Sequence, residues 1–171
     1  MLYSIGTKGK TVPWSNPCVS GEVTCAWSSV YDSYQYKVES LVSRPPEQTW
    51  SDTTSKPNSW MAVDLGPQRR LVVNHYALRD GARHGYTPRN WELQGAESME
   101  GEWTTLRRHD NDESLDETKS HAEASWAVEG GGSVSFRCFR VLQHGMNASR
   151  GYEDYLCCAG IELYSVLTGA R

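Results

Sequence analysis

Short runs of alternating apolar and polar residues recur along the chain, and clusters of Gly, Pro, Asn and Asp separate them. This alternation is typical of a β-strand with one buried face, and such turn residues end strands. Helical periodicity never continues for more than a few turns. The strand-like runs cover residues 59–66, 71–79, 90–96, 103–109, 125–128, 133–143 and 156–167. Joined by long irregular loops, they predict an all-β protein, either a β-sandwich or a jelly roll.

The last run, LCCAGIELYSVL, contains two adjacent cysteines. Strict alternation puts Cys157 on one face with Ala159, Ile161 and Leu163, and turns Cys158 to the other face. Neighbouring strand residues point in opposite directions, so this pair is poorly placed to bind one metal ion. Cysteine packs well as a small hydrophobe. We therefore expect Cys157 to pack inward and Cys158 to turn toward the opposite face or the preceding loop.

Length and charge limit the classes of function. The chain has 171 residues, of which 38% are hydrophobic, so it suits one domain with its own core. Its net charge is -4 and its basic residues are scattered, which argues against nucleic acid and membrane surfaces as partners. The first residues lack an apolar core of signal-peptide length.

The five cysteines give a further indication of compartment. An odd number cannot pair completely within one chain, and a chain of this length builds a core without disulfides. We therefore expect free thiols and an intracellular protein, cytoplasmic or nuclear. A disulfide from Cys18 or Cys25 to the last strand stays open, because it depends on a geometry that the sequence does not show.

Known catalytic and metal-binding motifs are missing from the sequence. There is no GxSxG nucleophile motif, no CxxC or HxxxH metal spacing, and the EGGG stretch lacks the residues of a phosphate-binding loop. Paired carboxylates occur only in the acidic segment 110–124, where solvation explains them. The chain itself is therefore not expected to be an enzyme.

Two long loops between strands carry side chains suited to recognition. Residues 79–89 and 144–155 combine Arg, His, Asn and Tyr with flexible glycines, and residues 27–36 add further tyrosines. The alternative for Arg79 and Arg89 is a structural one, in which they anchor the loop to carbonyls or to the acidic segment. If the loops meet at one end of a sandwich, the ligand-binding residues are Tyr34, Tyr36, Arg79, Arg83, His84, Tyr86, Arg89, His144, Asn147, Arg150, Tyr152 and Tyr155.

Five phrases carry a family resemblance. In order, PNSWMAVDLG, NHYALRDG, PRNWELQGA with GEWTTL, FRCFRVLQHGMN and LCCAGIELY resemble the discoidin, or coagulation factor 5/8 type C, family. The similarity covers residues 3–167, and it is closest to the intracellular modules appended to BTB-domain proteins and ubiquitin ligases. It implies a galactose-binding-like jelly roll of about eight main antiparallel strands. It also implies a single domain over residues 1–171, cut from a longer protein and monomeric in isolation.

The resemblance implies a non-catalytic recognition module. Family members bind sugars, phospholipid head groups or proteins through loops at one end of the jelly roll. We expect a protein or peptide ligand, with substrate or degron capture or scaffolding in a ubiquitin-ligase-type protein as its role. A lectin-like, glycan-binding module is the alternative, and a purely structural docking domain is a third.

Two further features of the family bear on the ligand. This sequence lacks the terminal cysteine pair and the hydrophobic spike loop of the secreted, membrane-binding members, so no lipid binding is expected. Some sugar-binding relatives hold a structural calcium ion near the last strand, where Glu162 stands in this sequence. Because no dense cluster of oxygen ligands surrounds it, we expect no cofactor and leave the calcium ion as an alternative.

Overall fold

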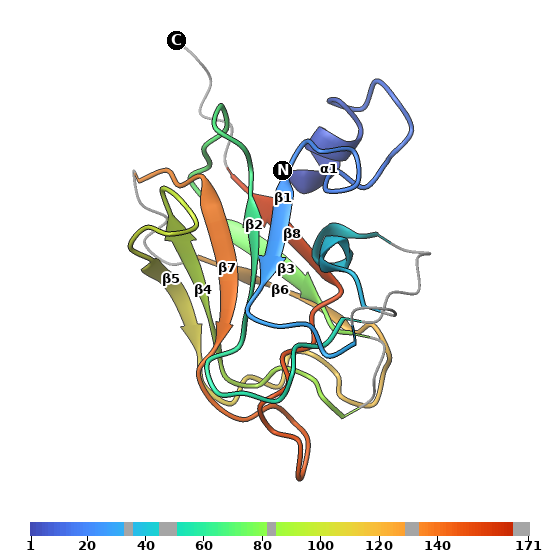
Figure 1. The fold of residues 1–171 in the computed structure, drawn as a ribbon, viewed down its shortest axis with the longest axis vertical. Helices are drawn as coiled ribbons and strands as arrows, with labels where there is room; N and C mark the ends of the chain where they lie inside the picture. Colours follow the sequence, from blue (N-terminus) through green and yellow to red (C-terminus); the bar gives the residue numbers. More distant parts are fainter. Residues whose placement is uncertain (33–35, 45–50, 82–84, 129–133, 166–171) are drawn as a thin grey trace.

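The computed structural model describes residues 1–32, 36–44, 51–81, 85–128 and 134–165. Within them, eight strands form two antiparallel sheets, as the sequence predicts. The five-stranded sheet has the order β1-β2-β7-β4-β5 and the three-stranded sheet the order β6-β3-β8. Figure 1 looks through the first sheet, in front, to the second sheet behind it. The all-β sandwich prediction is therefore confirmed.

Most strands are shorter than the runs that predict them, because the chain bends away into loops at their ends. The exceptions are β6, which is one residue longer than run 125–128, and β1, which lies in none of the predicted runs. The elements are α1 (Leu2–Gly6), β1 (Thr24–Trp27), η1 (Val38–Val42), β2 (Trp60–Asp64), β3 (His75–Arg79), β4 (Trp91–Ala96), β5 (Thr104–His109), β6 (Glu123–Ala127), β7 (Cys138–Gln143) and β8 (Gly160–Tyr164). The α-helix α1 and the 3-10 helix η1 each have five residues, too few for a periodic pattern to reveal. In the described part of the chain, no helix has the length and apolarity needed to cross a membrane.

One hydrophobic core fills the space between the two sheets. Alternate residues of each strand point into it, which is what a period of two requires. The largest fully buried side chains come from both sheets and from the loops between them. They include Trp91, Tyr76, Phe139, Leu41, Met61, Leu65, Leu78, Leu93, Leu115, Leu156 and Leu163.

A chain of polar contacts crosses this core. The indole nitrogen of Trp91 on β4 donates to the Tyr76 hydroxyl on β3 over 3.0 Å, and that hydroxyl lies 2.5 Å from Nε2 of His109 on β5. Nδ1 of His109 lies 2.6 Å from the Asp112 carboxylate. The His109 ring also stacks on Trp91, with 4.2 Å between ring centroids. The two sheets and the start of the acidic loop are thereby joined through side chains.

The protonation states in this chain follow from burial. Burial lowers the pKa of His109, because the imidazolium ion would lose its hydration. With a neutral ring, Nδ1 of His109 donates to Asp112 and Nε2 accepts from Tyr76. Each of these hydrogen-bonding groups then has a partner in the core. Removing one member leaves buried groups unsatisfied.

The adjacent cysteines are arranged differently from the prediction. Both are fully buried, but it is Cys158 that joins the hydrophobic core together with Ile161 and Leu163. Cys157 forms an isolated bridge with Asp52, and its thiol donates to the Asp52 carboxylate. The burial predicted for Cys157 is confirmed, but the facing predicted for Cys158 was wrong, because strict alternation starts only at Gly160, where β8 begins to pair with β3.

A second buried carboxylate, Asp80, lies at the start of the loop that follows β3. Its side chain is 1% exposed and accepts hydrogen bonds from the Gly81 amide (2.7 Å) and the Thr87 hydroxyl (2.6 Å). Burial raises the pKa of Asp80 to about 7, and the nearby charge of Asp52 acts in the same direction. The protein therefore favours the protonated form of this carboxyl below neutral pH.

We expect Tyr76→Phe to lower the free energy of unfolding by about 1–3 kcal/mol, because it leaves His109 and Trp91 without their buried partner. Urea unfolding followed by tryptophan fluorescence measures this change. The matched control is Tyr164→Phe, which removes a hydroxyl from a ring that is 44% exposed. It should change the stability by less than about 0.5 kcal/mol. Equal losses of stability in the two variants would show that the buried hydrogen bonds of Tyr76 do not contribute to stability.

Asp80 predicts a pH dependence of stability. Its pKa is near 3.8 when the chain is unfolded and about 7 when folded, so the folded state binds more protons between these values. Stability is then lost as the pH rises toward and through 7, on the order of 2 kcal/mol between about pH 5 and about pH 8. Asp80→Asn keeps uncharged hydrogen-bonding groups at this position and should remove most of this loss.

Unfolding midpoints in urea at several pH values test the Asp80 prediction. Glu113→Gln, which alters an exposed carboxylate, is the control and should keep the pH profile of the unmodified protein. A profile of Asp80→Asn that matches the unmodified protein would show that Asp80 does not cause the pH dependence.

Candidate functional site

Four long connections lie at one end of the sandwich. Because the strands are antiparallel, every second connection lies at the same end of the sandwich. The connections at this end join β1 to β2, β3 to β4, β5 to β6 and β7 to β8. The connections are residues 28–59, 80–90, 110–122 and 144–159. Apart from η1, which lies beside the strands, the described parts of these connections are mostly in the lower part of Figure 1, where the connection after β7 projects furthest. We call this region the loop end.

Five tyrosines from three of these connections form one contiguous cluster at the loop end. Ring centroids are 5.9 Å apart for Tyr31 and Tyr36, and 5.6 Å apart for Tyr31 and Tyr155. Tyr86 lies 5.6 Å from Tyr155 and 6.0 Å from Tyr152. These separations are those of edge-to-face and tilted aromatic contacts. We call the five residues the tyrosine cluster.

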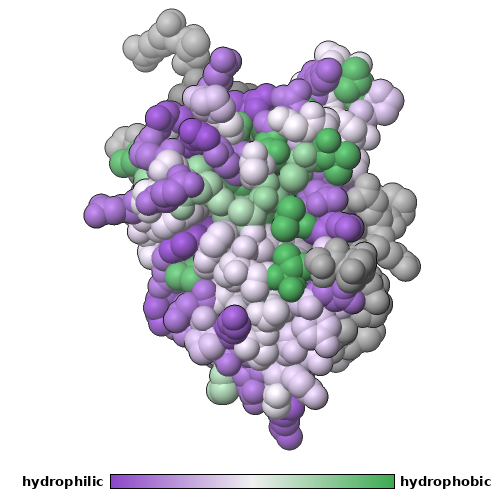
Figure 2. All heavy atoms as spheres, in the orientation of Figure 1, coloured by the Kyte–Doolittle hydropathy of each residue, from purple (hydrophilic) through white to green (hydrophobic). Residues whose placement is uncertain are grey.

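The tyrosine cluster presents aromatic rings to the solvent. The exposed fraction is 55% for Tyr152 and 46% for Tyr31, whereas Tyr36 is buried beneath them. Figure 2 shows that the lower half of the molecule is coloured mainly in pale tones, those of residues with intermediate hydropathy. Strongly hydrophilic residues are more frequent toward the upper end and the left edge of this view, and some also lie at the lowest tip. The loop end thus has an amphipathic surface.

Asn147 shapes the loop that carries two of the tyrosines. Its side-chain amide donates to the carbonyls of Tyr152 (3.0 Å) and Tyr155 (2.9 Å), and its oxygen accepts from the Ser149 amide (2.7 Å). Only 6% of Asn147 is exposed. Asn147 therefore holds the loop closed from inside and is a positioning residue for the cluster.

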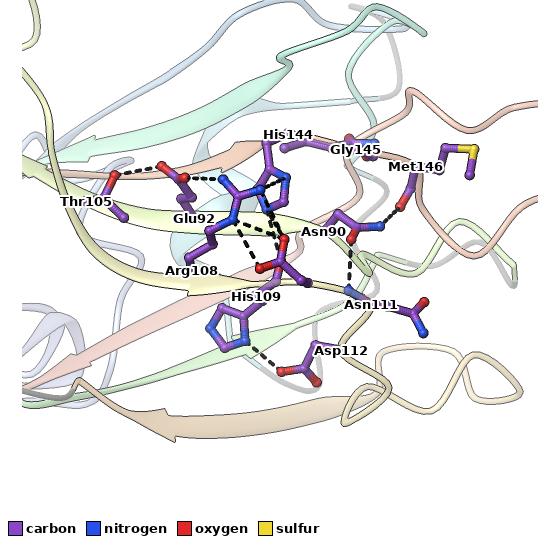
Figure 3. A network of polar contacts seen from close by, with 12 residues as sticks. Asn90, Glu92, Thr105, Arg108, His109, Asn111, Asp112, His144, Gly145 and Met146 are labelled. Carbon is purple, nitrogen blue, oxygen red and sulfur yellow. Dashed lines mark hydrogen bonds and ion pairs between the residues drawn. The ribbon is translucent and has the colours of Figure 1, made fainter.

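A polar network joins the acidic loop to the loop after β7 (Figure 3). Arg108 is its centre, with contacts to Glu92 (2.9 Å), Asp110 (3.0 Å) and Nδ1 of His144 (3.2 Å). Nε2 of His144 donates to the carbonyl of His109 over 2.9 Å. The network fixes the position of one loop relative to the other.

Asn90 extends the network between the same two loops. Its amide nitrogen donates to the carbonyl of Met146 (2.7 Å), and its oxygen accepts from the Asn111 amide (2.8 Å). Beside it lies a groove of about 580 Å³ between the acidic loop and residues 145–150. Its lining includes Asn111, Glu113, Glu117, Met146 and Arg150. The loop end therefore combines an aromatic surface with an adjacent polar groove.

Two of the arginines expected at the site are engaged inside the protein. Arg79 is 5% exposed and donates to the Ser43 hydroxyl (2.9 Å) and the Ala159 carbonyl (2.5 Å). Arg89 donates to the carbonyls of Asp112 and Leu115, both at 3.1 Å, and to the carboxylate of Glu117 at 2.7 Å. These contacts are the structural alternative considered for both residues. We therefore leave Arg79 out of the binding surface, whereas Arg89 also lines the polar groove.

The other expected residues divide into three groups. Tyr36, Tyr86, Tyr152 and Tyr155 come together in the tyrosine cluster, and Arg150 is exposed at the groove. His144 and Asn147 hold the loops in place. Tyr34, Arg83 and His84 lie outside the described residues.

Several residues that build this end are not among the expected ligand-binding residues. Tyr31 belongs to the cluster, and it lies in segment 27–36, which was considered for its tyrosines. Asn90, Arg108 and Asn111 lie beside strand ends, where polar residues are ordinary, so nothing distinguished them. The network depends on contacts between residues more than 15 positions apart, such as Arg108 and Glu92 at 2.9 Å.

Glu162, the position considered for calcium, is paired with protein groups. Its carboxylate accepts from the Arg44 guanidinium (2.8 Å) and the Tyr3 amide (2.9 Å). Among the described residues, no group of three or more His, Cys, Asp or Glu side chains is arranged to hold a metal ion. All five cysteines are free thiols in this structure.

Known sequences similar to this chain include two ubiquitin ligases. The chain is 34% identical to the E3 ubiquitin-protein ligase hecd-1 of Caenorhabditis elegans, over 96% of its own length. It is 35% identical to the E3 ubiquitin-protein ligase Ufd4 of Drosophila melanogaster, over 99% of its length. In both cases the match spans only 6% of the ligase. The chain matches no protein-family model.

Solved structures with the same fold include two that are named as carbohydrate- or chitosan-binding modules. A chitosan-binding module from Paenibacillus superposes with a TM-score of 0.60 at 16% identity, covering 84% of this chain and 96% of that module. The family 32 carbohydrate-binding module of Clostridium perfringens NanJ, solved with galactose, gives 0.59 at 14% identity, covering 85% and 95%. An F5/8 type C domain from Bacteroides fragilis gives 0.59 at 19% identity, covering 85% and 92%.

These matches confirm the resemblance that the five sequence phrases indicate. The identities to solved structures are low, so those structures support the fold and not a ligand. The chain therefore has the β-sandwich fold of F5/8 type C domains, and it is similar in sequence to a short segment of two E3 ubiquitin-protein ligases.

Proposed function

We propose that this chain is a non-catalytic module that binds a protein or peptide at the loop end. The observation that carries the proposal is the tyrosine cluster, which three separate connections assemble into one partly exposed surface. Tyrosine is enriched at protein interfaces because it supplies a large, rigid contact area and a polar tip at low entropic cost. Exposed tyrosines gathered in one place therefore need a reason beyond stability.

The form of the site supports an extended ligand. The groove is open to solvent along the acidic loop, and its rim carries the polar side chains of Asn111, Glu113 and Arg150. A peptide that lays an apolar side chain on Tyr31 and Tyr152 can pair its backbone and polar groups along this rim. The supporting network around Arg108 keeps the surface in one arrangement before the ligand binds.

The ligase relatives suggest the setting of this binding. The chain is similar to a segment of two proteins named as E3 ubiquitin-protein ligases. We therefore place the module in a longer, intracellular protein of this type, cytoplasmic or nuclear, where it captures a substrate or degron or serves as a scaffold. In this proposal the isolated domain is a monomer, needs no cofactor and does not act on nucleic acid or membranes.

Carbohydrate binding is the second candidate. Two of the similar solved structures are named as carbohydrate-binding modules, and exposed tyrosine rings can stack on sugars. The exposed rings of Tyr31 and Tyr152 are the observation that supports carbohydrate binding. The two candidates share one surface and differ in the ligand.

The test is a peptide library and a glycan array probed with the same purified 171-residue chain. We expect peptide hits whose affinity falls by about tenfold or more, about 1.4 kcal/mol, in Tyr31→Ala and in Tyr152→Ala. Isothermal titration calorimetry on the best hit measures the change. Saturable sugar binding that depends on the same tyrosines, without peptide binding, would overturn the first candidate in favour of the second.

The matched control is Tyr164→Ala, because Tyr164 is also exposed but lies on β8, outside the loop end. It should leave peptide affinity unchanged. Circular dichroism and urea unfolding check that each variant stays folded. If all three alanine variants bind like the unmodified chain, the tyrosine cluster is not the binding surface.

A further inference from the structure

Most of the charged side chains that line the polar groove are paired inside the protein. Arg89 donates to the Glu117 carboxylate over 2.7 Å, and the Asp116 carboxylate lies 3.0 Å from Nζ of Lys119. Arg89 also donates to two backbone carbonyls of the acidic loop, so its charge is engaged in holding that loop. The opposite charges of each pair largely cancel at the distance of a bound ligand.

Glu113 and Arg150 are the exceptions. Both side chains are exposed at the groove, and in the described part of the chain neither forms an ion pair or a side-chain hydrogen bond, with each other or with a third residue. Glu113 lies on the acidic loop and Arg150 on the loop after β7, so the two charges stand on different walls. The groove therefore presents one free negative and one free positive charge to the solvent.

The two walls of the groove are held together by one side chain, Asn90 (Figure 3). It donates to the carbonyl of Met146 on one wall over 2.7 Å and accepts from the amide of Asn111 on the other wall over 2.8 Å. The separation of the walls is thus set by hydrogen bonds within the protein, before any ligand is present.

The backbone is also anchored close to each free charge. Leu115, two residues after Glu113, is fully buried. On the other wall, the buried Asn147 accepts from the amide of Ser149, which directly precedes Arg150. Both charges therefore stand on ordered backbone, which lowers the entropic cost of pairing them with a ligand.

The groove is continuous with the tyrosine cluster. Arg150 lies two residues before Tyr152, and Asn147, which lines the groove, donates to the carbonyls of Tyr152 and Tyr155. Met146 adds an apolar side chain to the groove that is 62% exposed. Because an extended chain advances by about 3.3 Å per residue, one short peptide can reach the aromatic rings and both charges.

We propose that the peptide ligand of the loop end carries one basic and one acidic side chain, the basic one paired with Glu113 and the acidic one with Arg150. This inference rests on the function proposed above and specifies the chemistry of its ligand. An ammonium or guanidinium group pairs with the Glu113 carboxylate, and a carboxylate accepts parallel hydrogen bonds from the Arg150 guanidinium. A peptide with one kind of charge gains a single pair and meets a like charge on the other wall.

Four pools of short synthetic peptides with blocked ends test the proposal. They contain no charged residue, one lysine, one glutamate, or one lysine and one glutamate, and they share the same mixture of uncharged residues elsewhere. Each pool is captured on the immobilised 171-residue chain at low salt, and bound peptides are identified by mass spectrometry. Fluorescence anisotropy then measures the affinity of the best peptide from each pool.

We expect the pool with both charges to give the tightest binding, about fivefold or more above the uncharged pool, as two exposed ion pairs allow. The difference should shrink at high salt, because salt screens exposed charges.

Two neutral substitutions assign each charge to its partner. Glu113→Gln should abolish the preference for lysine and keep that for glutamate, whereas Arg150→Gln should do the reverse. Damage to the groove would lower both preferences together, so the crossed result distinguishes pairing from a structural role. The matched control is Glu102→Gln, which alters an exposed carboxylate in the connection from β4 to β5, at the other end of the sandwich, and should change neither preference.

The results distinguish a wrong charge assignment from a wrong function. The charge assignment is overturned, and peptide binding stands, if peptides bind through Tyr31 and Tyr152 but the pool with both charges binds no better than the others. The same holds if the two glutamine substitutions change both preferences alike. If no pool binds, or if binding survives both Tyr31→Ala and Tyr152→Ala, the proposed function fails and the charge assignment fails with it.

Discussion

The rest of the structure depends on one buried chain of contacts, Trp91 to Tyr76 to His109 to Asp112. Hydrophobic burial brings the two sheets together, but it is not directional. Hydrogen bonds between buried polar groups are directional, and leaving one unmade costs more than making it gains. This row of side-chain contacts therefore fixes how the five-stranded sheet lies on the three-stranded sheet. Because it ends at Asp112, it also fixes where the acidic loop leaves β5.

Further polar contacts connect this buried row of side chains to the loops at the surface. Arg108 and His144, next to the buried chain, join the acidic loop to the loop after β7. Asn147 then closes that second loop and sets the positions of the two tyrosines it carries. The exposed rings thus rest on the half-buried contacts of Asn147, and the contacts of Arg108 that join the two loops lie at the surface. Such preorganisation lowers the entropic cost of binding, which suits a recognition surface better than a solvated loop.

Sequence reasoning predicted the strands well and the loop contacts poorly, for physical reasons. Alternation reports which face of a strand is buried, so the two sheets and the core followed from it. The sequence, however, does not distinguish an arginine that binds a ligand from one that donates to a backbone carbonyl of the protein. Arg79 and Arg89 serve inside the protein because loops distant in sequence bring carbonyls to them. The facing of Cys158 was misassigned for a related reason, since alternation is interrupted where the chain leaves one pairing partner for another. Asp80 precedes a glycine and looks like a turn residue, so its burial had no signal.

The central claim is that the loop end, and neither sheet face, is where this domain meets its ligand. Amide hydrogen exchange, measured with and without the strongest ligand from the two screens, tests this claim most directly. The account predicts slower exchange in the connections that carry the tyrosine cluster, around Tyr31, around Tyr86 and across residues 144–155, with little change in β3 and β8. Protection confined to the outer face of either sheet, or to the turn before β1, would contradict it.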